Sequence, residues 1–459
     1  MRQKASLLLM VAVFWVFAQM VDTRQAVAQS LLRDSETEEF LRDVTRPLFE
    51  AAGLVPEAVD IYIIGDNTPN AFVTMGQSMF IHTGLFLAAD NFNQVLGVLA
   101  HETGHISGGH FARSDENAEA PTAMALLSML LGAAAMAAGS ADAGIGLMMG
   151  GQTMAQRSAL SFSRSQETAA DQAGARLLTA IGASGRGLME FFENLRSREM
   201  MMLIRQNPYV RTHPLNSDRI LRLQNVLSNS PFFNTPTPPE VEAKFQRIKA
   251  KMAGYMQDPR ITFNDYPETD TSVAARYARV YAYNQNIEWN KALDEAYSLI
   301  EEYPEDPYFR EIAGQILMEN GQVQESLPYY RQANELKPED PLIMTSLAHS
   351  LSTLETPEYD KEAIDLLEQV VSIDTINAFA WRLLATIYTR TNQEALASHA
   401  SAEMFLLYRQ YGNAIQHATR AENMLDRGTP KWLRTQDILI AARQGAVEQA
   451  NQMRRQRRR

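Results

Sequence analysis

The stretch Val95-Leu-Gly-Val-Leu-Ala-His101-Glu102-Thr-Gly-His105 decides how the first half of the chain is interpreted. Its apolar residues predict a buried helix, and it ends in the pattern H-E-x-x-H. Residues i and i+4 of a helix lie one turn apart on the same face, so both imidazoles can reach one Zn²⁺ at about 2.0–2.1 Å. Glu102 lies beside them, where its carboxylate can accept a proton from an attacking water. The pattern favours a zinc site over the alternative, which is a helix with two satisfied core histidines.

A catalytic zinc needs three protein ligands, and a predicted helix that follows residue 165 offers the third. Its residues Glu167 and Asp171 are four apart and therefore share a face. Glu167 is the better candidate ligand, and the other carboxylate can accept a hydrogen bond from the second nitrogen of a ligand histidine. Small residues such as Ala173 and Gly174 would let this helix approach the first one closely. Without the histidine motif, two such acids would predict only a solvated face.

These motifs, in this order, resemble those of the gluzincin zinc peptidases that include HtpX and the CAAX prenyl proteases. The resemblance covers about residues 60–225 and includes Thr212-His213-Pro214 and Arg219. It implies specific roles for five side chains: zinc ligands His101, His105 and Glu167, general base Glu102, and Asp171 as support for a ligand.

His213 has two possible roles beyond local loop structure. The resemblance implies that it can fill the open zinc position and hold the enzyme shut. The alternative is that His213, or Arg219, donates to the oxyanion or to the leaving group. Between residues 72 and 81, short strands could hold an extended substrate by adding it to a sheet edge.

The N-terminus predicts export from the cytoplasm. Arg2 and Lys4 precede an apolar run, and Ala26-Val27-Ala28 is a small-residue cleavage site. Residues 1–28 are therefore predicted to be a cleaved signal peptide of a periplasmic protein, with an uncleaved anchor as the alternative. The 459 residues include no cysteine, so disulfides and a lipid anchor at this junction are excluded. A net charge of −12 argues against general nucleic-acid binding.

The second half of the chain repeats. Pro304-Glu-Asp-Pro307 recurs 34 residues later as Pro338-Glu-Asp-Pro341, which is the tetratricopeptide period, and residues 374–377 are the next equivalent. We count four units from about residue 270, followed by a terminal helix near Trp432. Such helix pairs stack into a superhelix with a concave binding surface. The predicted fold is mainly α with a small β-sheet: a gluzincin metallopeptidase domain followed by a tetratricopeptide-repeat α-solenoid.

Composition sets the expected boundaries. These are a signal peptide at 1–28, the metallopeptidase domain at 29–229, a linker with a helix at 230–269, the repeats at 270–445 and a basic tail at 446–459. The stretch 123–150, rich in Ala, Met and Gly, is too weakly apolar for a transmembrane helix. It predicts either a buried helical hairpin or an adaptable surface that contacts a membrane or a client. The tail is either solvated or touches an anionic lipid.

Together these features predict a periplasmic endopeptidase with one Zn²⁺ per chain, whose repeats recruit protein partners. A periplasmic branch of the resembled family joins such a domain to tetratricopeptide repeats. This resemblance implies outer-membrane β-barrel proteins and their assembly machinery as substrates and partners. The alternative is a non-proteolytic chaperone or scaffold for outer-membrane proteins with a latent zinc site. Glu102 argues against that alternative, since a structural zinc has no use for it.

Overall fold

The computed structural model describes residues 30–74, 77–110, 164–201, 209, 213 and 217–457. The predicted signal peptide, the stretch 123–150, Thr212, Pro214 and the last two residues of the basic tail lie outside these ranges. Within them, no helix is both long enough and apolar enough to cross a membrane. The predicted fold class, mainly α with a small sheet, is confirmed.

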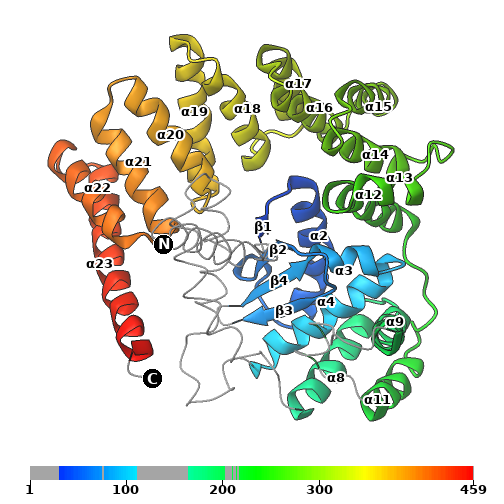
Figure 1. Cartoon of the computed structure of the whole chain (residues 1–459). Coiled ribbons are helices and arrows are strands. Elements are labelled where there is room, and N and C mark those ends of the chain that lie inside the picture. Colours follow the sequence, from blue (N-terminus) through cyan, green and yellow to red (C-terminus); the bar gives the residue numbers. More distant parts are fainter. Residues whose placement is uncertain are drawn as a thin grey trace, which may run out of the picture.

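The described part of the first half contains a four-stranded sheet (Figure 1). Its strands are β1 (Ser30–Leu32), β2 (Asp60–Gly65), β3 (Ala71–Thr74) and β4 (Ser78–His82), in the order β1-β2-β4-β3. β2 and β4 run parallel, and the two outer pairs are antiparallel. The short strands predicted between residues 72 and 81 are β3 and β4. β3, at one end of the order, packs against the motif-bearing helix α4 (Phe92–Ser107).

α4 is the buried axis of this half. Asn91 caps its first turn by accepting a hydrogen bond from the Gln94 amide. Two helices cross α4 closely, because glycines of α4 leave room for them: Gly97 faces Leu188 of α9 (Arg186–Met201), and Gly104 faces Ala170 of α8 (Arg164–Ala180). The close approach of α8 that its small residues predicted is therefore confirmed.

Backbone conformation sets where two further helices begin and end. α2 (Ser35–Ala51) stops because Gly53 adopts a φ of +73°. A separate 3₁₀ turn follows at Pro56–Ala58. Thr83 is the first residue of α3 (Thr83–Ala88), and its hydroxyl donates to the Asp66 carbonyl. Helix α11 (Ser217–Ser228) completes the first half.

The repeat half is a row of antiparallel helix pairs that curves around the first half (Figure 1). The first helices of the four pairs begin at residues 273, 307, 341 and 378, so two intervals match the predicted 34-residue period and the third is longer. Two further helices end the row. The bounds of all these helices are α14 (Val273–Gln285) with α15 (Trp289–Glu302), α16 (Pro307–Glu319) with α17 (Val323–Leu336), α18 (Pro341–Thr353) with α19 (Pro357–Ile373), α20 (Ala378–Arg390) with α21 (Glu394–Leu407), then α22 (Tyr411–Met424) and α23 (Pro430–Arg457). α23 continues through most of the predicted basic tail, since residues 446–453 contain no helix breaker.

The predicted linker contributes to packing. It contains α12 (Pro239–Met256) and α13 (Pro259–Asp265). Phe245, Ile248 and Met252 of α12 belong to the apolar core of the first half, and α12 also packs against α14 of the repeats. α12 therefore packs against both halves and connects them.

A polar ladder adds to this junction. Three aspartates that recur every 34 residues each bond to a residue outside the repeats. The pairs are Asp306 with Arg247, Asp340 with Ser35, and Asp374 with Arg33. Asp306 and Asp340 are the equivalent N-cap residues of α16 and α18, whereas Asp374 is the C-cap of α19. All three acids meet α12 or the segment at the start of α2.

Candidate metal centre

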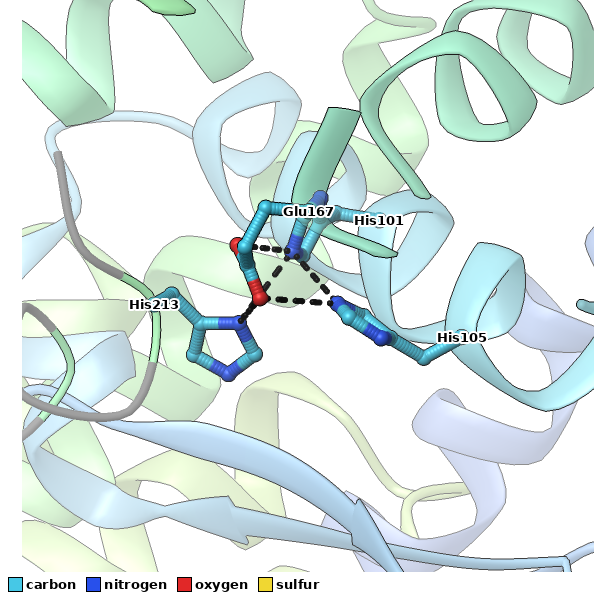
Figure 2. A group of neighbouring side chains, drawn as sticks. All are labelled: His101, His105, Glu167 and His213. Carbon is cyan, nitrogen blue, oxygen red and sulfur yellow. Dashed lines mark hydrogen bonds and ion pairs between the residues drawn. The ribbon is translucent and has the colours of Figure 1, made fainter. Parts of the chain in front are cut away.

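Three elements bring four possible ligands into one buried cluster (Figure 2). α4 supplies His101 and His105, α8 supplies Glu167, and His213 lies between α9 and α11. One ligand atom from each residue lies within 4.8 Å of every other. The sequence placed His101, His105 and Glu167 together through two separate helix faces, and the structure brings them together.

The spacing of these atoms fits a tetrahedral ion. The Nε2 atom of His101 lies 3.1 Å from Nε2 of His105 and 3.3 Å from Nδ1 of His213. Oε1 of Glu167 lies 3.4 Å from Nε2 of His105 and 3.1 Å from Nδ1 of His213. Zinc bonds of about 2.0–2.1 Å in a tetrahedron would separate neighbouring ligand atoms by about 3.3–3.4 Å. The residues present therefore fit a divalent metal ion held by three imidazoles and one carboxylate.

Asp171 supports this cluster from behind. Its Oδ1 lies 3.0 Å from Nδ1 of His101, the nitrogen that faces away from the other ligands. Arg219 donates to both oxygens of Asp171, at 2.6 and 2.8 Å, and its Nη1 lies 2.6 Å from Oε2 of Glu167. Burial alone would raise the pKa of Asp171, but the bonds from Arg219 and His101 hold it below its ordinary value. Arg219 thus pairs with two buried carboxylates at once. Its role as a proton donor stays a prediction.

Glu102 lies on α4 next to the ligands and is completely buried. Among the described residues, neither of its carboxylate oxygens accepts a hydrogen bond, and Nε2 of His213 is 3.4 Å from Oε1. Burial raises the pKa of Glu102, and the neighbouring His213 and His101 only partly oppose this. A carboxylate whose pKa is raised towards neutrality is suited to accept and return a proton.

His213 faces two ways at once. Its Nδ1 points into the ligand cluster, and its Nε2 points to Glu102. The backbone amide of His213 donates to the carbonyl of Tyr209 at 2.7 Å, and the two rings are stacked with centroids 4.6 Å apart. His213 therefore lies where a fourth ligand would lie.

Sequence reasoning missed two residues of this site, Tyr209 and His110. His110 lies five residues after His105 and contacts its ring. A third histidine at the end of the motif helix was a visible signal. Tyr209 carried no such signal, since no motif of the sequence includes it.

Comparison with known proteins agrees with this geometry. The model of a protein family described as "Peptidase family M48" matches residues 35–227 of this chain. This part of the chain is a peptidase family M48 domain. The matched residues include both the H-E-x-x-H motif and the Glu167–Asp171 pair. The predicted resemblance to a peptidase family is therefore confirmed.

Curated relatives extend the match. A "putative beta-barrel assembly-enhancing protease" of Vibrio cholerae is 23% identical over 407 residues, which are 87% of this chain and 83% of that protein. A "mitochondrial metalloendopeptidase OMA1" of Schizosaccharomyces pombe is 25% identical over 191 residues, 41% of this chain and 52% of that protein. The chain is therefore a metalloprotease with an M48 domain.

Among solved structures, a tetratricopeptide-repeat protein, YrrB, described as having an unusual peptide-binding site, matches with a TM-score of 0.28 and 15% identity. The match covers 50% of this chain and 99% of that chain. At so low a TM-score, the solenoid rests on its own 34-residue period and helix pairs.

Proposed function

We propose that this chain is a zinc endopeptidase of the bacterial envelope that cleaves proteins and recruits them, or partner proteins, through its repeats. The observation that carries the proposal is the buried cluster of His101, His105, Glu167 and His213 with Glu102 beside it. Imidazole and carboxylate are donors that suit zinc. A site that only stabilised the fold would have no use for a buried carboxylate next to the ligands.

The chemistry follows from the positions of the side chains. When bound, the metal ion would polarise the scissile carbonyl and acidify the attacking water. Glu102 accepts the proton of that water and then donates it to the leaving amine. Asp171 fixes the ring of His101 through Nδ1, and Arg219 holds Asp171 in place. Burial excludes competing water from Glu102, so that the proton stays available for the amine.

His213 supports the proposal of a resting, shut enzyme. With Nδ1 among the ligands, its ring takes the position that a catalytic zinc leaves open. A closed state that is favoured by about 2.7 kcal/mol would leave about 1% of molecules open. Activity then depends on movement of the His213 ring away from the cluster, which the arrival of a client at the repeats could favour.

Substrate binding can use the sheet. β3 is at one end of the strand order and packs against α4, which carries the site. An extended segment that adds to β3 would run past the metal cluster, with backbone hydrogen bonds that do not depend on its sequence. This arrangement suits a protease for unfolded or partly assembled clients.

The proposed location and substrates depend on the names of the relatives. Curated relatives over most of the chain are named for enhancing β-barrel assembly. We propose the same setting here, with outer-membrane β-barrel proteins and their assembly machinery as substrates and partners. The predicted signal peptide at 1–28 supports a periplasmic location. Peripheral contact with a membrane, through residues 123–150 or the C-terminal arginines, remains a prediction.

The first test is casein digestion by the purified mature protein, with and without a chelator. Wild type should cleave casein, the chelator should abolish cleavage, and added Zn²⁺ should restore it. Glu102→Gln should lose cleavage while it keeps its metal, because Gln fills the same space without a basic oxygen. Its matched control is Glu193→Gln on the exposed side of α9, which should cleave as wild type does. Full activity of Glu102→Gln would overturn the proposed mechanism.

The second candidate function, a chaperone or scaffold with a latent site, is favoured by the position of His213. The same assay separates the two candidates. If His213→Ala binds zinc and still cleaves nothing, while client binding by the repeats persists, the scaffold is the better description.

A further inference from the structure

His110 returns to the metal cluster from beyond the end of the motif helix. α4 ends at Ser107, and Gly109 then adopts a φ of +58°, a conformation that glycine tolerates best. The reversal lays the His110 ring against Gly108, where a side chain on that residue would lie 2.5 Å from Nε2 of His110. The ring is only 8% exposed. The positive φ of Gly109 thus allows His110 to be buried, although none of the proposed chemical steps uses this histidine.

The ring of His110 meets the far side of a proposed metal ligand. Its Nδ1 lies 3.1 Å from Nδ1 of His105, and the rings meet edge to face at 81°. Nε2 of His105 is the atom in the metal cluster. His110 therefore contacts the one nitrogen of His105 that a metal would leave available.

The geometry fixes which nitrogen carries each proton. A neutral His105 that offers the lone pair of Nε2 to a metal must carry its proton on Nδ1. That proton can be donated to Nδ1 of His110, 3.1 Å away, which then accepts it. His110 in turn must be the neutral tautomer with its proton on Nε2. One hydrogen bond thus selects the tautomer of His105 in which Nε2 is able to bind metal.

His110 is also tied to the helix that supplies the third ligand. Nε2 of Gln166 donates to the backbone carbonyl of His110 at 3.0 Å, and Gln166 is the neighbour of Glu167. The two motif histidines consequently differ in their support. Asp171 supports His101 with a charged acceptor, whereas His110 supports His105 with a neutral one.

We propose that His110 is a positioning residue, which holds His105 in the orientation and tautomer that bind the metal ion. The inference rests on the metal site proposed above and adds a residue to it. Loss of such a supporting bond typically lowers metal affinity by about 10- to 100-fold.

Two substitutions separate the hydrogen bond from simple packing. In His110→Asn, Oδ1 can take the place of Nδ1 and accept the same bond, whereas His110→Leu fills space without any acceptor. The measurement is the Zn²⁺ dissociation constant of the full-length mature apoprotein, by competition with a chromophoric chelator. A Co²⁺ absorption spectrum reports the ligand geometry without reference to activity. We expect His110→Leu to bind Zn²⁺ about 10- to 100-fold more weakly and His110→Asn to remain within about 3-fold of wild type.

Each result has one meaning. Wild-type affinity in His110→Leu overturns the inference, and so does an equal loss in both variants, since packing would then be the cause. His105→Ala distinguishes the two levels of the argument. If wild type holds no ion that depends on His105, the metal site and the inference both fall. If it holds one and His110→Leu is unaffected, only the inference falls.

Discussion

Replacing Gly104 with alanine should damage the metal site by moving two helices apart. A Cβ at this position would lie 2.7 Å from the carbonyl oxygen of Ala170 on α8, about 0.7 Å closer than the 3.4 Å at which ordinary contact begins. The neighbouring atom belongs to backbone, so the two helices must separate. α4 carries two of the ligands and α8 carries Glu167. Ligand distances in metal sites tolerate about 0.2 Å, so this displacement exceeds what the site can absorb.

Two quantities should change in the Gly104→Ala variant. Overpacking costs about 1–3 kcal/mol, and the better helix propensity of alanine returns about 1 kcal/mol. We therefore expect a free energy of unfolding that is up to about 2 kcal/mol lower, with Zn²⁺ affinity reduced by more than about 10-fold. Chelator competition measures the affinity, and urea denaturation of the apoprotein measures the stability.

Gly97→Ala is the matched control. Its Cβ would lie 2.6 Å from Leu188 of α9, which is an equally severe contact on the same helix. α9 supplies no ligand, so this variant should lose stability but keep most of its Zn²⁺ affinity. Wild-type affinity in Gly104→Ala, or an equal loss in Gly97→Ala, would refute the reasoning that the α4–α8 separation sets the site.

Three further outcomes follow from other contacts. His213→Ala should raise basal casein cleavage, with zinc content unchanged, and reduced cleavage would instead show that His213 assists the transition state. Burial raises the pKa of Glu311 to about 8, with Lys251 opposing and the acids nearby adding to the shift, so folding stability should fall as pH rises from about 4.5 to about 8. In thermal melts, Glu311→Gln should therefore gain more over wild type at pH 9 than at pH 5, and an equal gain at both would contradict the pKa. Arg33→Asp and Asp374→Arg should each speed hydrogen exchange at the start of α2, and the charge-swapped pair should recover if their 3.1 Å contact joins the two halves.

The parts of the site that the sequence could predict are those set by helical spacing. His101 and His105 share a face because they are four residues apart, and Glu167 and Asp171 do so for the same reason. The pairing of the two helices was readable from the small residues between them. The 34-residue period likewise predicted the solenoid. In each case one local rule determines the position of the side chain.

The features that the sequence did not show depend on contacts between distant segments. β1 is three residues long, and only its pairing with β2 makes it a strand. α12 looked like a charged linker helix, yet its apolar face completes the core of the first half. His110 needed the turn at Gly109 before its ring could reach His105. Asp306 and Asp340 lie in the recurring Pro-Glu-Asp-Pro stretch, but their partners Arg247 and Ser35 could not be predicted from it.

Anomalous X-ray diffraction at the zinc edge, on crystals of the mature protein, tests the central claim most directly. The account predicts one strong peak per chain, within bonding distance of Nε2 of His101, Nε2 of His105 and a carboxylate oxygen of Glu167, and loss of that peak in His105→Ala. A peak bound elsewhere, or a peak that survives the loss of His105, would contradict it.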